Sequence, residues 1–198
     1  MNELVEILQK TEHGFKHIEK AGNELMENTE LNHFELALSF LDNSVYQSRM
    51  LATYLFGRIS TSDQNAFDIL KNKIGQDKNW RVQEMLAKAF DYYCKILGYE
   101  RALPTIKNWL NDKNPNVKRA VVEGLRIWTN RPYFKENPKI AIELISQFKN
   151  SDSEYLRKSV GNALRDISKK HKLLVEQEVA TWELNDEKII FTKKLIDK

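Results

Sequence analysis

The chain has 198 residues, of which 41% are hydrophobic and 30% are charged, and its formal net charge is +3. No apolar run approaches the roughly 20 residues that a membrane-spanning helix needs, and the acidic, amphipathic start of the chain is unlike a secretory signal. The one cysteine, Cys94, excludes an internal disulfide. Because a lone thiol fits a reducing compartment, we expect a cytoplasmic protein.

Helical spacing of apolar residues runs through the whole chain. It predicts one or two amphipathic helices in residues 2–28, followed by pairs of helices. The first helices of the pairs are expected near residues 31–41, 63–75, 98–110 and 138–149. The second helices are expected near residues 45–59, 79–96, 115–128 and 153–170, with a last partial pair near 172–182 and 186–196.

Turn aspartates recur at intervals of about 34 to 40 residues, and this spacing is typical of stacked helical pairs. They are Asp42, Asp77, Asp112, Asp152 and Asp186. The sequence therefore predicts an all-α fold, a right-handed superhelix (solenoid) of HEAT-like helical repeats. We expect a single domain over residues 1–198, with N-terminal helices in 1–28 and repeats in 31–198. Functional residues are expected on the concave side, where every repeat presents one helix face.

Residues 129–134, Thr-Asn-Arg-Pro-Tyr-Phe, lengthen the third interval. Loops that depart from a repeat are more often functional than structural. Several aromatic residues lie in this loop or at helix starts, where they could stack on a base or a sugar: Trp80, Tyr133, Phe134 and Tyr155. The other large aromatics fall at helix-pair positions and are expected in the core: Trp109, Trp128, Tyr93, Tyr99 and Phe148.

Charged residues line up when the second helices are aligned by the repeat. One column reads Arg49, Glu84, Arg119 and Lys158. The basic residues on this side suit a phosphate backbone, and they are Arg49, Arg119, Arg126, Arg157, Lys158 and Arg165. The alternative is a solvated face with pairs one turn apart, such as Glu123 with Arg119.

Three carboxylates stand among these basic residues, namely Glu84, Glu123 and Asp166. Carboxylates beside a sugar C1′ can stabilise an oxocarbenium-like transition state and position water. The alternative is that each one pairs with an arginine. Trp80 precedes Glu84 by one helical turn, so both are expected on the same face. The His13 and His17 pair has Gly14 where a metalloprotease helix has glutamate, so we expect no metal site.

Three segments resemble the HEAT-like DNA alkylation repair family, the AlkC- and AlkD-type DNA glycosylases. They are NWRVQEML (79–86), NPNVKRAVVEGLR (114–126) and SDSEYLRKSVGNALRDISKKH (151–171), and the resemblance covers roughly residues 31–182. It implies excision of N3- or N7-alkylated purines from duplex DNA by cleavage of the N-glycosidic bond. It implies catalytic roles for Glu84, Glu123 and Asp166. It implies DNA-binding roles for Trp80, Arg119, Arg126, Tyr155, Arg157, Lys158, Asn162 and Arg165.

The sequence also departs from the family pattern. Residues 127–132 read Ile-Trp-Thr-Asn-Arg-Pro where AlkC-type proteins have Leu-Pro-Trp-Ala, and Asn162 stands at the second tryptophan position of the AlkD pattern. Two alternatives therefore stay open: an inactive relative that binds damaged or branched DNA, and a HEAT scaffold that binds a protein partner. The favoured expectation is a monomer that binds alkylated duplex DNA without a cofactor, a metal or a membrane.

Overall fold

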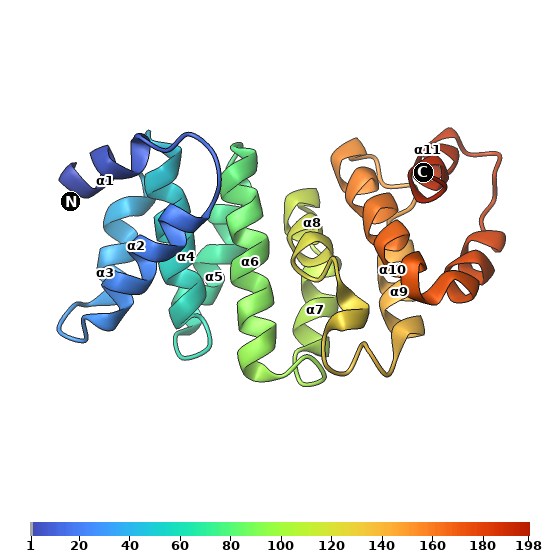
Figure 1. Ribbon diagram of the computed structural model, residues 1–198, viewed down its shortest axis with the longest axis horizontal. Coiled ribbons are helices and arrows are strands. Elements are labelled where there is room, and N and C mark those ends of the chain that lie inside the picture. Colours follow the sequence, from blue (N-terminus) through green and yellow to red (C-terminus); the bar gives the residue numbers. More distant parts are fainter. Residues whose placement is uncertain (1) are drawn as a thin grey trace. The chain divides into compact units, whose positions relative to one another are not determined.

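The computed structural model describes residues 2–198 and consists of helices and their connections (Figure 1). Among these described residues there is no β-strand. The all-α, helical-repeat architecture predicted from the sequence is thereby confirmed. Contacts divide the chain into two compact units, Met1–Ile96 and Leu97–Lys198.

The first unit is built around one buried helix, α4 (Tyr46–Ile59). It packs against its neighbours in sequence: α1 (Asn2–Gln9), α2 (Lys16–Glu27), α3 (His33–Leu41) and α5 (Gln64–Asn72). Every residue of α4 from Gln47 to Gly57 except Arg49 is buried. After η1 (Ile74–Gln76), helix α6 (Trp80–Leu97) packs against α5, where the Phe67 and Tyr93 ring centroids lie 4.3 Å apart.

In the second unit the longest helix, α10 (Glu154–Ala180), occupies the central position. It packs against three other helices, α8 (Pro115–Gly124), α9 (Pro138–Ser146) and α11 (Glu187–Ile196), and α7 (Leu103–Leu110) packs on α8. Non-helical backbone at His171 kinks α10. The kink separates two helical segments at the boundary between the expected helices 153–170 and 172–182.

The residues before each second helix form the same turn in four repeats. A side-chain oxygen accepts a hydrogen bond from the backbone N–H two residues later, and the acceptors are Asn43, Asp77, Asp112 and Ser151. Short polar side chains favour this turn because they mimic a backbone acceptor. The turn aspartates at 77 and 112 thus mark helix starts for a local physical reason.

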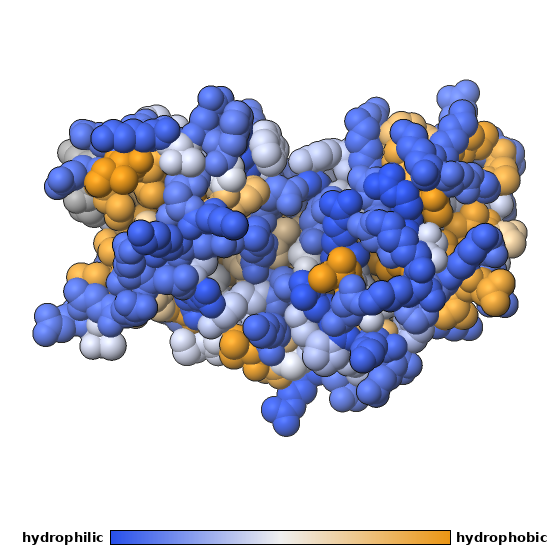
Figure 2. All heavy atoms as spheres, in the orientation of Figure 1, coloured by the Kyte–Doolittle hydropathy of each residue, from blue (hydrophilic) through white to orange (hydrophobic). Residues whose placement is uncertain are grey.

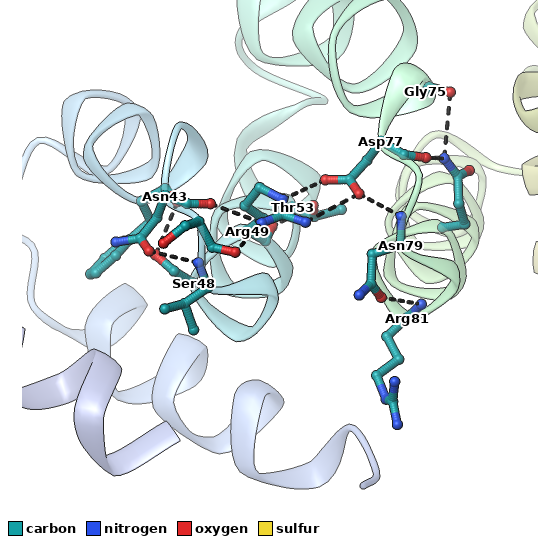
Figure 3. A network of polar contacts seen from close by, with 12 residues as sticks. Asn43, Ser48, Arg49, Thr53, Gly75, Asp77, Asn79 and Arg81 are labelled. Carbon is teal, nitrogen blue, oxygen red and sulfur yellow. Dashed lines mark hydrogen bonds and ion pairs between the residues drawn. The ribbon is translucent and has the colours of Figure 1, made fainter. Parts of the chain in front are cut away.

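Side chains six residues after three of these acceptors hold the turn from within the helix. Arg49 donates to the carbonyl of Asn43 (Figure 3). It also donates to the carbonyl of Ser44, and Gln83 donates to that of Asp77. Arg157 donates to the carbonyls of Ser151 and Asp152. Arg49, Gln83 and Arg157 therefore occupy equivalent positions in their repeats. The expected alignment of Arg49 with Glu84 and Lys158 was wrong by one residue, because turn geometry rather than charge sets the register.

The 129–134 segment also differs from expectation. Phe134 is fully buried, and its ring centroid lies 4.7 Å from that of Trp128 and 6.2 Å from that of Tyr99. Its expected stacking on a base or sugar is thus wrong, because the side chain is needed in the core. Helix α8 ends at Gly124 rather than near 128, and a short turn, η2 (Trp128–Asn130), follows. Trp109, Trp128 and Tyr99 are buried, as expected.

The surface seen in Figure 2 is mostly hydrophilic, with smaller hydrophobic patches between the charged residues. The exposed apolar side chains include Leu173 and Leu184 in the second unit. No helix among residues 2–198 combines the length and the apolar character needed to cross a membrane.

Candidate nucleic-acid interface

The first part of the candidate site is the start of α6. Trp80 is the first residue of this helix, and its side chain is 49% exposed. Half-buried Glu84 follows one turn later, so the two residues share a helix face as the sequence predicted. An indole beside a carboxylate offers a stacking surface next to a negative charge.

Arg81 braces Trp80 from the next position in the helix. Its guanidinium carbon lies 4.6 Å from the centroid of the Trp80 ring and 5.0 Å from that of Tyr46. Its Nη2 atom lies 3.0 Å from Nδ1 of His13, in the connection between α1 and α2. The hydroxyl of Tyr46 donates to the carbonyl of Glu12 at 2.8 Å. The connection after α1 is thereby attached to the residues around Trp80.

Glu123 belongs to the second unit, and its carboxylate is enclosed by donors. Its side chain is 11% exposed. The hydroxyl of Ser159 donates to its Oε1 atom at 2.6 Å. Arg119 Nη2 lies 3.8 Å from Oε1, and Arg126 Nη1 lies 3.9 Å from Oε2. The expected pair of Glu123 with Arg119 is therefore present, together with a hydrogen bond from Ser159 that the sequence did not indicate.

Asp166 is also held by cations. Arg126 Nε lies 2.8 Å from its Oδ2 atom, and Lys169 Nζ lies 2.8 Å from its Oδ1 atom. Burial raises the pKa of Asp166, but the hydrogen bonds and charges of Lys169 and Arg126 outweigh it, so the pKa is lowered. Arg126 thus joins Glu123 to Asp166. Beside Asp166 lies an open cavity of about 320 Å³, whose lining includes Ile127, Asn130 and Lys170.

The basic residues expected at DNA fall into two groups by exposure. Arg119 and Arg157 are buried: Arg119 stacks 3.9 Å from the centroid of the Tyr155 ring, and Arg157 holds the turn before α10. The more exposed group comprises Arg126, Lys158 and half-buried Arg165, and Lys158 pairs with Glu154 at 2.7 Å. Tyr155 is 41% exposed and Asn162 is half-buried. Their DNA-binding roles stay predictions.

Several residues that contact the expected ones could not be predicted from the sequence. Ser159 binds Glu123, Lys169 binds Asp166, and Lys170 donates to the side-chain oxygen of Asn130. A serine on an amphipathic helix and lysines at its surface carry no distinct pattern, so the sequence held no signal for these contacts. Among residues 2–198, no group of three His, Cys, Asp or Glu side chains is placed to hold a metal ion.

Two solved structures from Streptococcus mutans are similar to this chain over nearly its whole length. AlkD2 of Streptococcus mutans is 46% identical, with a TM-score of 0.94 over 100% of this chain and 95% of that one. The smu.31 protein of Streptococcus mutans UA159 is 44% identical, with a TM-score of 0.86 over 98% of each chain. Both similarities extend over nearly the whole of this chain.

Two further similarities are more distant. The alkylpurine DNA glycosylase AlkC of Pseudomonas fluorescens, bound to DNA containing an abasic site analog, shares the fold at 17% identity. Its TM-score is 0.53 over 98% of this chain and 63% of that one. YhaZ of Bacillus subtilis (strain 168) is 32% identical over 91 residues, and the match spans 44% of this chain and about a quarter (26%) of that curated relative.

The family model described as DNA alkylation repair enzyme matches residues 15–188. This match includes all the helices from α2 to α10, and with them every candidate residue named above. The resemblance found in the three sequence segments is confirmed. The chain belongs to the DNA alkylation repair enzyme family.

Proposed function

We propose that this protein binds alkylated duplex DNA and excises N3- or N7-alkylated purines by hydrolysing the N-glycosidic bond. Family membership supports the proposal, as does the similarity to AlkD2 over the full chain. AlkC, which has the same fold, is an alkylpurine DNA glycosylase with DNA in its structure. We further propose a cytoplasmic monomer that works without a metal or a cofactor.

The observation that carries the proposal is the pair of Trp80 and Glu84. An exposed indole can stack on a nucleotide, and the carboxylate one turn later then lies beside it. An alkylated purine is already cationic and leaves readily. The sugar C1′ gains positive charge as the base departs, so a fixed carboxylate stabilises the transition state and can orient the attacking water. Glu84 is the residue to which we assign this role.

Glu123 and Asp166 are given a supporting role in this proposal. Each already accepts charged hydrogen bonds or ion pairs from arginine or lysine, so its negative charge is largely compensated. We assign these two residues to positioning Arg126, whose side chain is 43% exposed and can reach a phosphate.

The same pairing favours a second candidate function, binding of damaged or branched DNA without excision. In that case two of the three acidic residues serve only to hold basic residues for the DNA backbone. The two candidates differ in one measurable quantity, the release of free base.

The test is to incubate the protein with duplex DNA carrying 7-methylguanine or 3-methyladenine and to chromatograph the released bases. Wild-type protein is expected to release base. Glu84→Gln keeps the shape and removes the charge, so it is expected to slow release by about 100- to 1000-fold. Its DNA affinity should be equal or higher, because a repulsive anion is gone. Binding without any release by wild-type protein overturns the glycosylase proposal and selects the second candidate.

A further inference from the structure

A second polar cavity lies within the first unit, between α2, α4 and α6. Its volume is about 350 Å³. The charged side chains that line it are the cations Arg58, Lys88 and Lys95 and the carboxylates Glu19 and Asp91. Asn23, Tyr54 and Tyr92 supply further polar atoms. None of the roles assigned above to Trp80, Glu84 or Arg126 uses this cavity.

Arg58 is fixed in one orientation by neutral partners. Its guanidinium carbon lies 4.2 Å from the centroid of the Tyr92 ring and 4.8 Å from that of Tyr54. Its Nε atom donates to the Tyr54 hydroxyl at 2.8 Å, and Nη2 donates to Asn23 Oδ1 at 3.3 Å. The Tyr54 hydroxyl in turn donates to Asn23. Three side chains, Tyr54, Tyr92 and Asn23, therefore hold a planar cation at this cavity.

The charge of Arg58 is stabilised without a carboxylate. Burial lowers the pKa of Arg58, and hydrogen bonds to Tyr54 and Tyr92 together raise it above its ordinary value. Within residues 2–198, neither Arg58 nor Lys95 forms an ion pair. Lys88 is partly compensated, because its Nζ atom lies 2.9 Å from Glu19. The cavity thus contains two cations, Arg58 and Lys95, that can each attract an anion.

Close helix packing shapes the cavity. Gly57 directly precedes Arg58, and a Cβ atom at this position would lie 2.6 Å from the Cβ of Ala89. The absent side chain lets α4 and α6 approach, which places Arg58 over Tyr92. Lys88 and Lys95 lie on α6 at helical intervals after Glu84. Helix α6 therefore contributes both the candidate catalytic residue Glu84 and part of the wall of this cavity.

We propose that this cavity is a phosphate-binding site, in which Arg58 makes the main contact and Lys95 assists from the rim. A guanidinium suits a phosphate because its parallel N–H groups match two phosphate oxygens. The phosphate can belong to the nucleic-acid backbone or to a free phosphate compound. Only the backbone source rests on the proposed DNA function.

A different explanation of the two cations is structural. Arg58 and Lys95 lie in the last turns of α4 and α6, where positive charges stabilise a helix end. This role predicts a loss of stability when they are replaced but no saturable binding of phosphate. The two explanations therefore separate in a binding experiment.

The first arm of the experiment is an amide NMR titration of the whole chain with inorganic phosphate, with sodium chloride at matched ionic strength as the reference. Saturable shifts are expected for residues around Arg58, Tyr92 and Lys95. Arg58→Gln should weaken phosphate binding about tenfold or more. Lys95→Ala removes an exposed side chain, so it tests the site even if Arg58→Gln is unstable. Lys107→Ala, an exposed lysine on α7, is the matched control and should change nothing.

The second arm measures the salt dependence of binding to unmodified duplex DNA. If the backbone is the source, Arg58→Gln and Lys95→Ala should each reduce the slope of log affinity against log salt by about 1. Saturable phosphate binding with unchanged slopes assigns the site to a free phosphate compound. Phosphate shifts that match the chloride reference, together with unchanged slopes, overturn the proposal. Base release is scored separately, so its failure leaves this result intact.

Discussion

At the scale of single residues, Arg126 is the side chain that organises the acidic cluster of the second unit. It contacts Glu123 within its own repeat and Asp166, which lies 40 residues later in the sequence. The first contact follows from helical spacing and could be expected. The contact with Asp166 depends on how α8 and α10 pack, and no local pattern in the sequence predicts it. A charge column predicted from one repeat therefore identifies the residues but not their partners.

The lowered pKa of Asp166 predicts a specific dependence of stability on pH. A carboxyl group with a lower pKa in the folded than in the unfolded state stabilises the fold above the unfolded value of about 3.9, and this contribution is lost as pH falls through the folded value. Asp166→Asn should thus be less stable than wild type near neutral pH. The difference should shrink below about pH 4.

Urea unfolding at a series of pH values measures this difference. Asp42→Asn is the control, because its pair with Lys73 is exposed and such pairs contribute little to stability. A deficit of Asp166→Asn that grows as the solution becomes acidic would contradict the assignment of Arg126 and Lys169 as the partners that matter.

At the scale of elements, turn chemistry explains why most helices were predicted close to their observed bounds. Asn, Asp and Pro mark the starts of α6 and α8, and the sequence shows them directly. The end of α8 was harder to predict, because apolar residues continue past Gly124 into a segment that tertiary packing folds differently. Phe134 was misjudged for the same reason, since a loop position says nothing about the cavity that the ring fills.

Arg157 and Lys158 are adjacent in α10, but their replacement is predicted to affect stability to very different extents. Arg157→Met leaves the carbonyls of Ser151 and Asp152 without their donor, which should cost about 2 to 4 kcal/mol of stability. Lys158→Met loses only an exposed pair with Glu154, so its stability should change by less than about 1 kcal/mol.

Chemical unfolding of both variants gives the comparison, and DNA binding adds a second one. If Lys158 contacts a phosphate, its replacement should lower the salt slope by about 1 while the fold stays intact. Equal stability of the two variants would show that the turn before α10 does not depend on the arginine.

At the scale of the whole molecule, each unit has its own core, and the family match runs through both. Leu86 in the first unit and Leu125 in the second are fully buried. Truncating either to alanine should cost about 2–5 kcal/mol. In helical-repeat proteins such losses spread first to the neighbouring repeats.

Hydrogen exchange followed by mass spectrometry locates the effect of each truncation. Leu86→Ala should raise exchange most in the peptides around α5 and α6, and Leu125→Ala in those around α8 and α10. A uniform rise over all peptides in either variant would indicate a single cooperative unit instead. The circular dichroism spectrum of each folded variant should remain that of a helical protein.

The distribution of tryptophans gives this protein a built-in optical reporter. Trp109, Trp128 and Trp182 are buried, whereas Trp80 alone among the four tryptophans is exposed. A collisional quencher such as acrylamide therefore acts mainly on the emission of Trp80. A ligand that stacks on this indole shields it, so quenching can report occupancy of the α6 face without a label.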